Sequence, residues 1–177
     1  MCGSNLKTVI LPRNLKIIND TSFHNLPNLE QIIIPYGLKE IYGSSFKNCP
    51  KLTKLTIPDS VLRIEGLEYS NALYNNENYN KNGLFKINNH IIEYINNDVE
   101  HLEIPEGIVS VNCIRSTSLK SITFPPSVKY IAKISCENLE SVTFSEGLIA
   151  AHGYDLFENC LSLKTIEFPA SFRGFIG

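Results

Sequence analysis

The sequence predicts a solenoid, in which short parallel strands stack coil on coil around one apolar core. Three observations favour this class. A pattern recurs along almost all 177 residues, apolar and polar residues alternate at the start of each copy, and a proline usually ends the alternating run. A fixed period of roughly 20 to 50 residues is typical of stacked units that cannot bury their apolar side alone.

The best-preserved copy begins at Leu29 and reads LEQIIIPYGLKEIYGSSFKNCP. The first position of this pattern also falls at Leu6 and Leu52, so the spacing is 23 residues. Four later copies follow at spacings of 47, 20, 20 and 24 residues, and 47 is close to two periods. They begin at Val99, Leu119, Leu139 and Leu163. We therefore predict one domain over residues 1–177, with seven recognisable coils and one irregular coil, as part of a longer array.

Each copy should begin with a short strand. In the first copy Leu6, Val9 and Leu11 are expected to face the core, and Thr8 and Ile10 to face outward. Proline ends the strand because it cannot donate to a strand ladder. These stops are Pro12, Pro35, Pro58, Pro105, Pro125 and Pro169, with Ser145 in place of one.

A turn and a second short strand should follow the proline. Glycine supplies a positive φ in several of these turns, at Gly37, Gly107 and Gly147. The second strand is expected to point a pair of apolar side chains inward in each coil. These pairs are Leu38 and Ile41, Val61 and Ile64, and Val128 and Ile131.

The third side of a coil is predicted to be a helical turn. Three columns of equivalent residues run along it, and each column has a structural interpretation. Phe23, Phe46, Tyr69 and Phe157 should fill the core, each contributing about 1.5–3 kcal/mol on burial. Cys49 and Cys160 share a column with Leu26 and Ala72 and should be buried, inert thiols. Asn25, Asn48, Asn71 and Asn159 should hydrogen-bond the backbone of their own or the next coil.

Two copies, those that begin at Val99 and Leu119, are three residues short and lack the phenylalanine. We expect the helical turn to be reduced to a bare loop there. Cys113 and Cys136 would lie in these loops and would be the more reachable thiols.

The irregular coil spans residues 74–97 and is dense in asparagine. Its segments LFKI and HIIEYI flank Asn88–Asn89, a pair that can close a two-residue hairpin. Insertions in repeat arrays often lie on the binding face, which makes Asn78, Tyr79 and His90 candidate contact residues. The alternative is a decorated coil that serves only packing.

The segment LEQIIIPYGLKEIYGSSFKNCPKL, at residues 29–52, resembles the BspA-type leucine-rich repeat, also called the Treponema-type class. The insertion NENYNKNGLFKINNHIIEYI is also similar to a feature of that family. The resemblance implies an α/β-type leucine-rich repeat solenoid, right-handed and curved. A parallel sheet of short strands would form one side, with short second strands and helical turns on the others. It also implies protein binding rather than catalysis, as in relatives associated with adhesion at bacterial and protist surfaces.

Composition gives no sign of other functions. The net charge is −2 and the pI about 6.1, so the chain lacks the basic footprint of a nucleic-acid-binding protein. No apolar run approaches the roughly 18 residues of a membrane span. The five cysteines form no CxxC pair, and the four histidines are far apart in the sequence. We therefore expect no cofactor, no metal and no enzymatic activity. The Asn19 sequon matters only if the chain is secreted.

The outward positions of the first strands are the other candidate binding surface. One column contains Ile10, Ile33 and Thr56 and continues to Glu103, and adjacent outward isoleucines are uncommon on a strand face. A neighbouring column contains Thr8, Gln31, Lys54 and His101. The two readings are a partner-binding stripe and a contact with a flanking coil.

The sequence thus leaves three functions open. The chain is an interaction module that binds another protein, a structural spacer in a longer array, or, least favoured, an enzyme. The module would be a surface adhesin if a secretion signal precedes these residues and an intracellular scaffold if none does.

Overall fold

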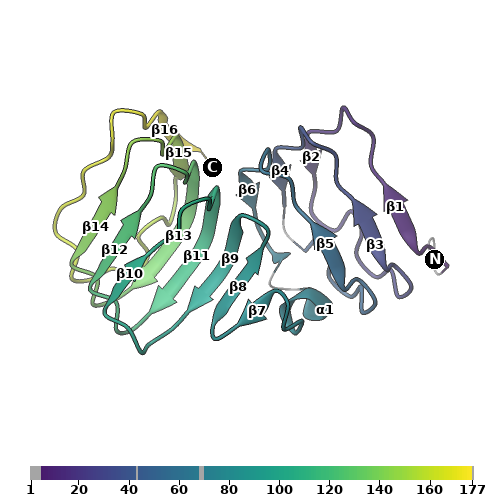
Figure 1. The fold of residues 1–177 in the computed structure, drawn as a ribbon, viewed down its shortest axis with the longest axis horizontal. Helices are drawn as coiled ribbons and strands as arrows, with labels where there is room; N and C mark the ends of the chain where they lie inside the picture. Colours follow the sequence, from purple (N-terminus) through teal and green to yellow (C-terminus); the bar gives the residue numbers. More distant parts are fainter. Residues whose placement is uncertain (1–4, 43, 68–69, 177) are drawn as a thin grey trace. The chain divides into compact units, whose positions relative to one another are not determined.

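The computed structural model describes residues 5–42, 44–67 and 70–176. The chain divides into two compact units: unit 1 comprises residues 1–81 and 85–88, and unit 2 comprises residues 82–84 and 89–177. Within each unit, short parallel strands lie side by side and there is little helix (Figure 1). The predicted solenoid of stacked parallel strands is therefore confirmed, while the assignment of one continuous domain stays a prediction.

Unit 1 contains two three-stranded parallel sheets. The first sheet is formed by the first strands of three coils, β1 (Thr8–Ile10), β3 (Gln31–Ile33) and β5 (Lys54–Thr56). The second sheet is formed by β2 (Ile17–Ile18), β4 (Glu40–Ile41) and β6 (Arg63–Ile64). Every pairing joins residues 23 positions apart, so the sequence period is the register of the sheet.

The irregular coil follows in α1 (Asn71–Tyr74) and β7 (Asn80–Lys81). The chain passes from unit 1 to unit 2 within residues 82–89, where β8 (Leu84–Ile87) lies. Asn88 follows β8 with a φ of 51°, the left-handed conformation that asparagine tolerates. The two segments predicted to be extended, LFKI and HIIEYI, are strands β8 and β9.

Unit 2 repeats the two-sheet arrangement. Its first strands are β10 (His101–Glu103), β12 (Ser121–Phe124) and β14 (Ser141–Phe144), which pair in that order. Its second sheet contains β9 (His90–Ile95), β11 (Ser110–Ser116), β13 (Tyr130–Cys136), β15 (Ala150–His152) and β16 (Gly174–Ile176), each beside the next.

Side chains at the predicted inward positions form the core. The six residues of the second-strand pairs are almost completely buried: Leu38, Ile41, Val61, Ile64, Val128 and Ile131. Among the leucines at the first position, Leu6 is 39% exposed and Leu163 is half-buried, whereas Leu29 and Leu52 are fully buried.

Glycines in the turns have the predicted backbone conformation, with φ values of 108° at Gly37, 89° at Gly107 and 128° at Gly147. Gly147 is also required for space, because a Cβ there would lie 2.1 Å from the carbonyl oxygen of Pro126 in the preceding coil. At this turn a side chain would both strain the backbone and separate two coils.

The phenylalanine column is only partly buried. Phe46 is 1% exposed, whereas Phe23 and Phe157 are half-buried. The rings of Phe23 and Phe46 stack with their centroids 6.0 Å apart, so the column continues from coil to coil. The prediction for Tyr69 falls outside the described residues. The third side in unit 1 consists mainly of turns, with α1 as a helix of four residues.

The prediction of bare loops in the two short copies is wrong. The third side there is strand: β11 and β13 run for seven residues each and pair in parallel from Ser110–Tyr130 to Ser116–Cys136. An extended chain rises about 3.3 Å per residue, against 1.5 Å in a helix. An extended segment therefore spans the third side with fewer residues than a helical turn would need. Its backbone N–H and C=O groups form hydrogen bonds with the strand of the neighbouring coil.

Replacing Phe46 by Ala should reduce the free energy of unfolding by about 3–5 kcal/mol, because the ring is buried and leaves a cavity. Phe23→Ala is the matched comparison and should cost less, since that ring is half-buried. Urea unfolding monitored by circular dichroism measures both changes. A loss below about 1 kcal/mol for Phe46→Ala would show that the column does not fill the core.

Candidate protein-binding surface

The first sheet of unit 1 brings six of the predicted contact residues together. Register aligns Thr8 with Gln31 and Lys54, and Ile10 with Ile33 and Thr56. All six side chains are exposed, because the residues between them, such as Ile32 and Leu55, face the core. The two predicted columns are thus adjacent rows on one strand face.

His101 and Glu103 lie on β10 in unit 2 and are exposed. His101 Nδ1 is 2.8 Å from Ser121 Oγ, at the position paired with it in the next coil. These two residues belong to a different sheet from the six of unit 1, so the structure does not join them to the same face.

Tyr79 and Asn78 of the insertion both make hydrogen bonds within the chain. The Tyr79 hydroxyl lies 3.0 Å from Leu55 N and 3.2 Å from Leu55 O, so it accepts from one and donates to the other. Tyr79 is half-buried, and its hydroxyl satisfies the backbone N–H and C=O groups of Leu55 in β5. Asn78 is exposed, and both its backbone N–H and its side-chain amide donate to Asn76 Oδ1 at 3.0 Å.

His90 cannot contact a partner at the surface, because it is fully buried. Its Nδ1 lies 2.9 Å from Ser110 Oγ on the neighbouring strand β11. We therefore remove His90 from the candidate surface. Its position next to a turn gave no sequence signal of burial.

An exposed apolar hollow lies at the end of the unit 1 strand face. Its volume is about 470 Å³, and it is lined by Ile10, Leu11, Arg13, Ile33, Pro35 and Tyr36. Ile10 is 73% exposed, Ile33 43% and Tyr36 80%, so three large apolar side chains face solvent together. We call these six lining residues the Tyr36 hollow.

Tyr36 and Arg13 are not among the contact residues predicted from the sequence. Both occupy the position after the strand-ending residue, where the other coils carry a residue without an aromatic ring: Asp59, Glu106, Pro126, Glu146 and Ala170. The aromatic residue at this position was the signal that could have identified the hollow.

The lining of the Tyr36 hollow carries a positive charge. Arg13 is exposed and contributes the charge of the lining, which contains no acidic residue. Among the described residues, no carboxylate lies within ion-pair distance of Arg13. Lys16 is close by, with its Nζ donating to the carbonyl oxygen of Gly37 at 3.4 Å.

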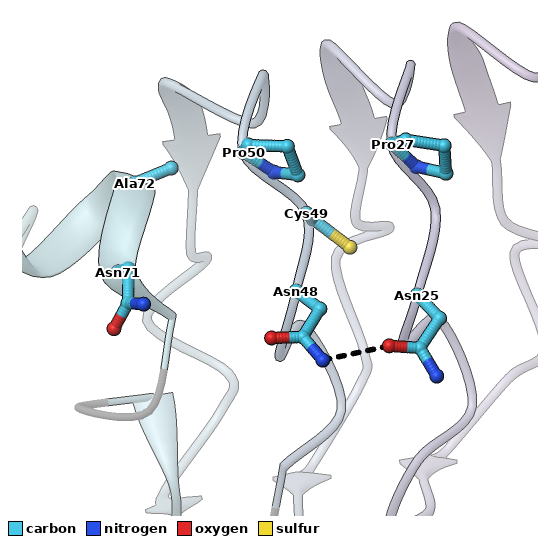
Figure 2. A pocket seen from close by; sticks show the side chains of 7 residues that line it. All are labelled: Asn25, Pro27, Asn48, Cys49, Pro50, Asn71 and Ala72. Carbon is cyan, nitrogen blue, oxygen red and sulfur yellow. Dashed lines mark hydrogen bonds between the residues drawn. The ribbon is translucent and has the colours of Figure 1, made fainter.

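A second hollow in unit 1 has a volume of about 390 Å³ and lies on the turns of the third side (Figure 2). Figure 2 shows Asn25 and Asn48 at equivalent positions of adjacent coils, with Asn48 Nδ2 donating to Asn25 Oδ1 at 2.7 Å. Both residues have a positive φ, of 57° and 59°. The prediction for this column was a bond to backbone, whereas this bond joins side chain to side chain.

The repeats of the chain match a known protein family. The family model described as the BspA type leucine rich repeat region matches residues 1–114 and 108–175, with six copies. The chain belongs to the BspA-type leucine-rich repeat family. The resemblance read from the sequence is confirmed, and no curated protein matches the chain.

Two solved structures resemble this BspA-type chain. One is a leucine rich cell surface protein from Faecalibacterium prausnitzii A2-165, with 24% identity, a TM-score of 0.46, and coverage of 96% of this chain and 49% of that one. The other is a leucine-rich repeat protein from Bacteroides ovatus ATCC 8483, with 20% identity, a TM-score of 0.36, and coverage of 95% and 45%. The chain thus spans about half the length of these proteins.

Burial affects three thiols of the described coils, those of Cys49, Cys136 and Cys160. Burial raises the pKa of Cys49 and of Cys160, and it raises that of Cys136 to about 12. Cys136 is fully buried at the end of β13, so the expectation of a reachable thiol there is wrong. Cys113 is half-buried.

The main titratable cluster of unit 2 is internally paired. Lys133 Nζ contacts Glu158 and lies 3.1 Å from Asp155 Oδ2, and His152 Nδ1 lies 2.9 Å from Asp155 Oδ1. Burial alone would raise the pKa of Asp155, but hydrogen bonds from Lys133 and His152 outweigh it and lower the pKa. The charged groups of this cluster therefore pair with one another.

Within residues 5–42, 44–67 and 70–176, no group of three or more His, Cys, Asp or Glu side chains is placed to hold a metal ion. The same ranges contain no helix with the length and apolar character needed to cross a bilayer.

Iodoacetamide at pH 8 should leave Cys136 unmodified in the native protein, because little thiolate forms when the pKa is about 12. The rate should be at least roughly 100-fold below that of the same residue in urea-unfolded protein. Peptide mass spectrometry measures both rates. A native rate within tenfold of the unfolded rate would show that the strand end is open.

Proposed function

We propose that this chain is a non-enzymatic protein–protein interaction module that binds through the first sheet of unit 1 and the Tyr36 hollow. The observation that carries the proposal is the exposed apolar lining of that hollow. Large apolar side chains gathered at the surface of a soluble protein are typical of interaction sites. Ile10, Ile33 and Tyr36 form such a group.

The composition of the hollow supports the same conclusion. Tyrosine and arginine are enriched among residues that dominate binding energy, particularly around pockets that exclude water. Tyr36 and Arg13 come from adjacent coils and line one hollow together with Ile33. The polar row of Thr8, Gln31 and Lys54 lies beside it on the same strands. This gives an apolar centre with a polar border, the usual organisation of a protein interface.

Adhesion at a cell surface is the more specific form of this proposal and rests on family membership. The rival form is an intracellular scaffold, and the structural spacer is the remaining alternative. The asparagine and cysteine turns have a regular geometry, which suits a role in holding the coils together. We therefore propose that binding occurs at the Tyr36 hollow and the strand face.

Ile33→Asp should abolish capture of partner proteins while leaving the fold intact, since the side chain is exposed but central to the hollow. Leu161→Asp is the matched control, because Leu161 is an 83% exposed aliphatic residue in unit 2. Quantitative mass spectrometry of proteins retained on immobilised wild type and variants measures the effect.

We expect proteins enriched by wild type to be lost with Ile33→Asp and retained with Leu161→Asp, with unchanged circular dichroism for all three. Equal retention by the Ile33→Asp protein would contradict binding through the hollow.

A further inference from the structure

We propose that the Tyr36 hollow accepts an internal acidic–apolar segment of a partner protein, with a bulky apolar side chain in the hollow and an Asp or Glu carboxylate on Arg13. This inference rests on the proposed protein-binding function and adds the chemistry of the partner. It follows from the shape and the charge of one small region of unit 1.

The apolar half of the segment is defined by the lining. Five of the six lining residues present apolar surface, and the sixth, Arg13, carries a charge. A volume of about 470 Å³ lies in the range of roughly 300–1,000 Å³ that takes small ligands. A single bulky side chain with part of its backbone therefore fits. Burying Ile10, Ile33 and Tyr36 against it removes apolar surface from water.

The acidic half is defined by Arg13. Its guanidinium has no carboxylate partner among the described residues, and a planar guanidinium binds a carboxylate through two parallel hydrogen bonds. Lys16, held at Gly37 O, adds a second positive charge near the same rim. No acidic side chain lines the hollow to repel the ligand.

The charges of the surrounding coils orient the segment. Asp59 occupies the position of Arg13 and Tyr36 in the third coil, so the cationic residue of this row belongs to the first coil. Further along the strand face, Lys7 and Glu30 already form a pair at 3.7 Å and offer little net charge. The carboxylate is therefore expected next to the first coil, at Arg13.

The test uses the whole chain and fluorescent peptides of about twelve residues, acetylated and amidated at their ends. One peptide carries a central phenylalanine flanked by glutamates, a second replaces the glutamates by lysines, and a third replaces the phenylalanine by alanine. A fourth lacks the internal glutamates and has a free C-terminal carboxylate instead. Fluorescence anisotropy at low and high salt measures binding.

The acidic phenylalanine peptide should bind most tightly, and more weakly at high salt. Arg13→Gln should weaken it roughly two- to fivefold, as for loss of an exposed ion pair. Arg173→Gln, an exposed arginine of unit 2, is the matched control and should have no effect. Arg13→Glu should reverse the preference in favour of the lysine peptide, a gain that misfolding cannot produce.

Equal binding of the acidic and lysine peptides, or no effect of Arg13→Gln, overturns this inference. Preference for the terminal carboxylate overturns the choice of an internal segment. Self-association that Ile33→Asp abolishes in analytical ultracentrifugation would make a second copy the occupant instead. In each case the proposed function survives if Ile33→Asp still loses protein capture, and it fails if capture persists.

Discussion

Parallel hydrogen bonding between successive coils is the interaction on which the rest of the structure depends. Backbone N–H groups at the strand starts donate to the equivalent carbonyl one coil earlier. Examples are Glu30 N to Lys7 O at 2.8 Å and Lys120 N to Glu100 O at 2.7 Å. This pairing satisfies polar groups that burial would otherwise leave unpaired. It also fixes which residues of different coils become neighbours.

The consequence is that like positions stack in rows. The rings of Phe124, Phe144 and Phe168 follow one another with centroids 5.3 Å apart, and Asn48 bonds to Asn25. Most rows repeat the same chemistry and serve stability. A residue that departs from its row, such as Tyr36, is presented on a rigid face without cost to the stack. Function in this architecture is therefore expected at departures from the repeat.

Sequence reasoning recovered what the repeat itself determines. The period predicted the register, and the glycines of the turns and the second-strand apolar pairs have the predicted φ and burial. It failed where the path of the chain depends on neighbouring coils. The third side at Cys136 became strand because parallel pairing was available there, and His90 is buried although it directly follows two asparagines. The six candidate positions on β1, β3 and β5 are exposed and in register as expected, but Tyr36 was not singled out from the sequence.

Deletion of one whole coil, residues 29–51, tests the account most directly, because it removes 23 residues and joins Asn28 to Leu52 at an equivalent position. If each coil is held by pairing with its nearest neighbours, the remaining coils should close up. Hydrogen exchange followed by mass spectrometry should then show native protection for the amides of β5 and of β11 and β13. Loss of protection throughout the remaining coils would contradict the account.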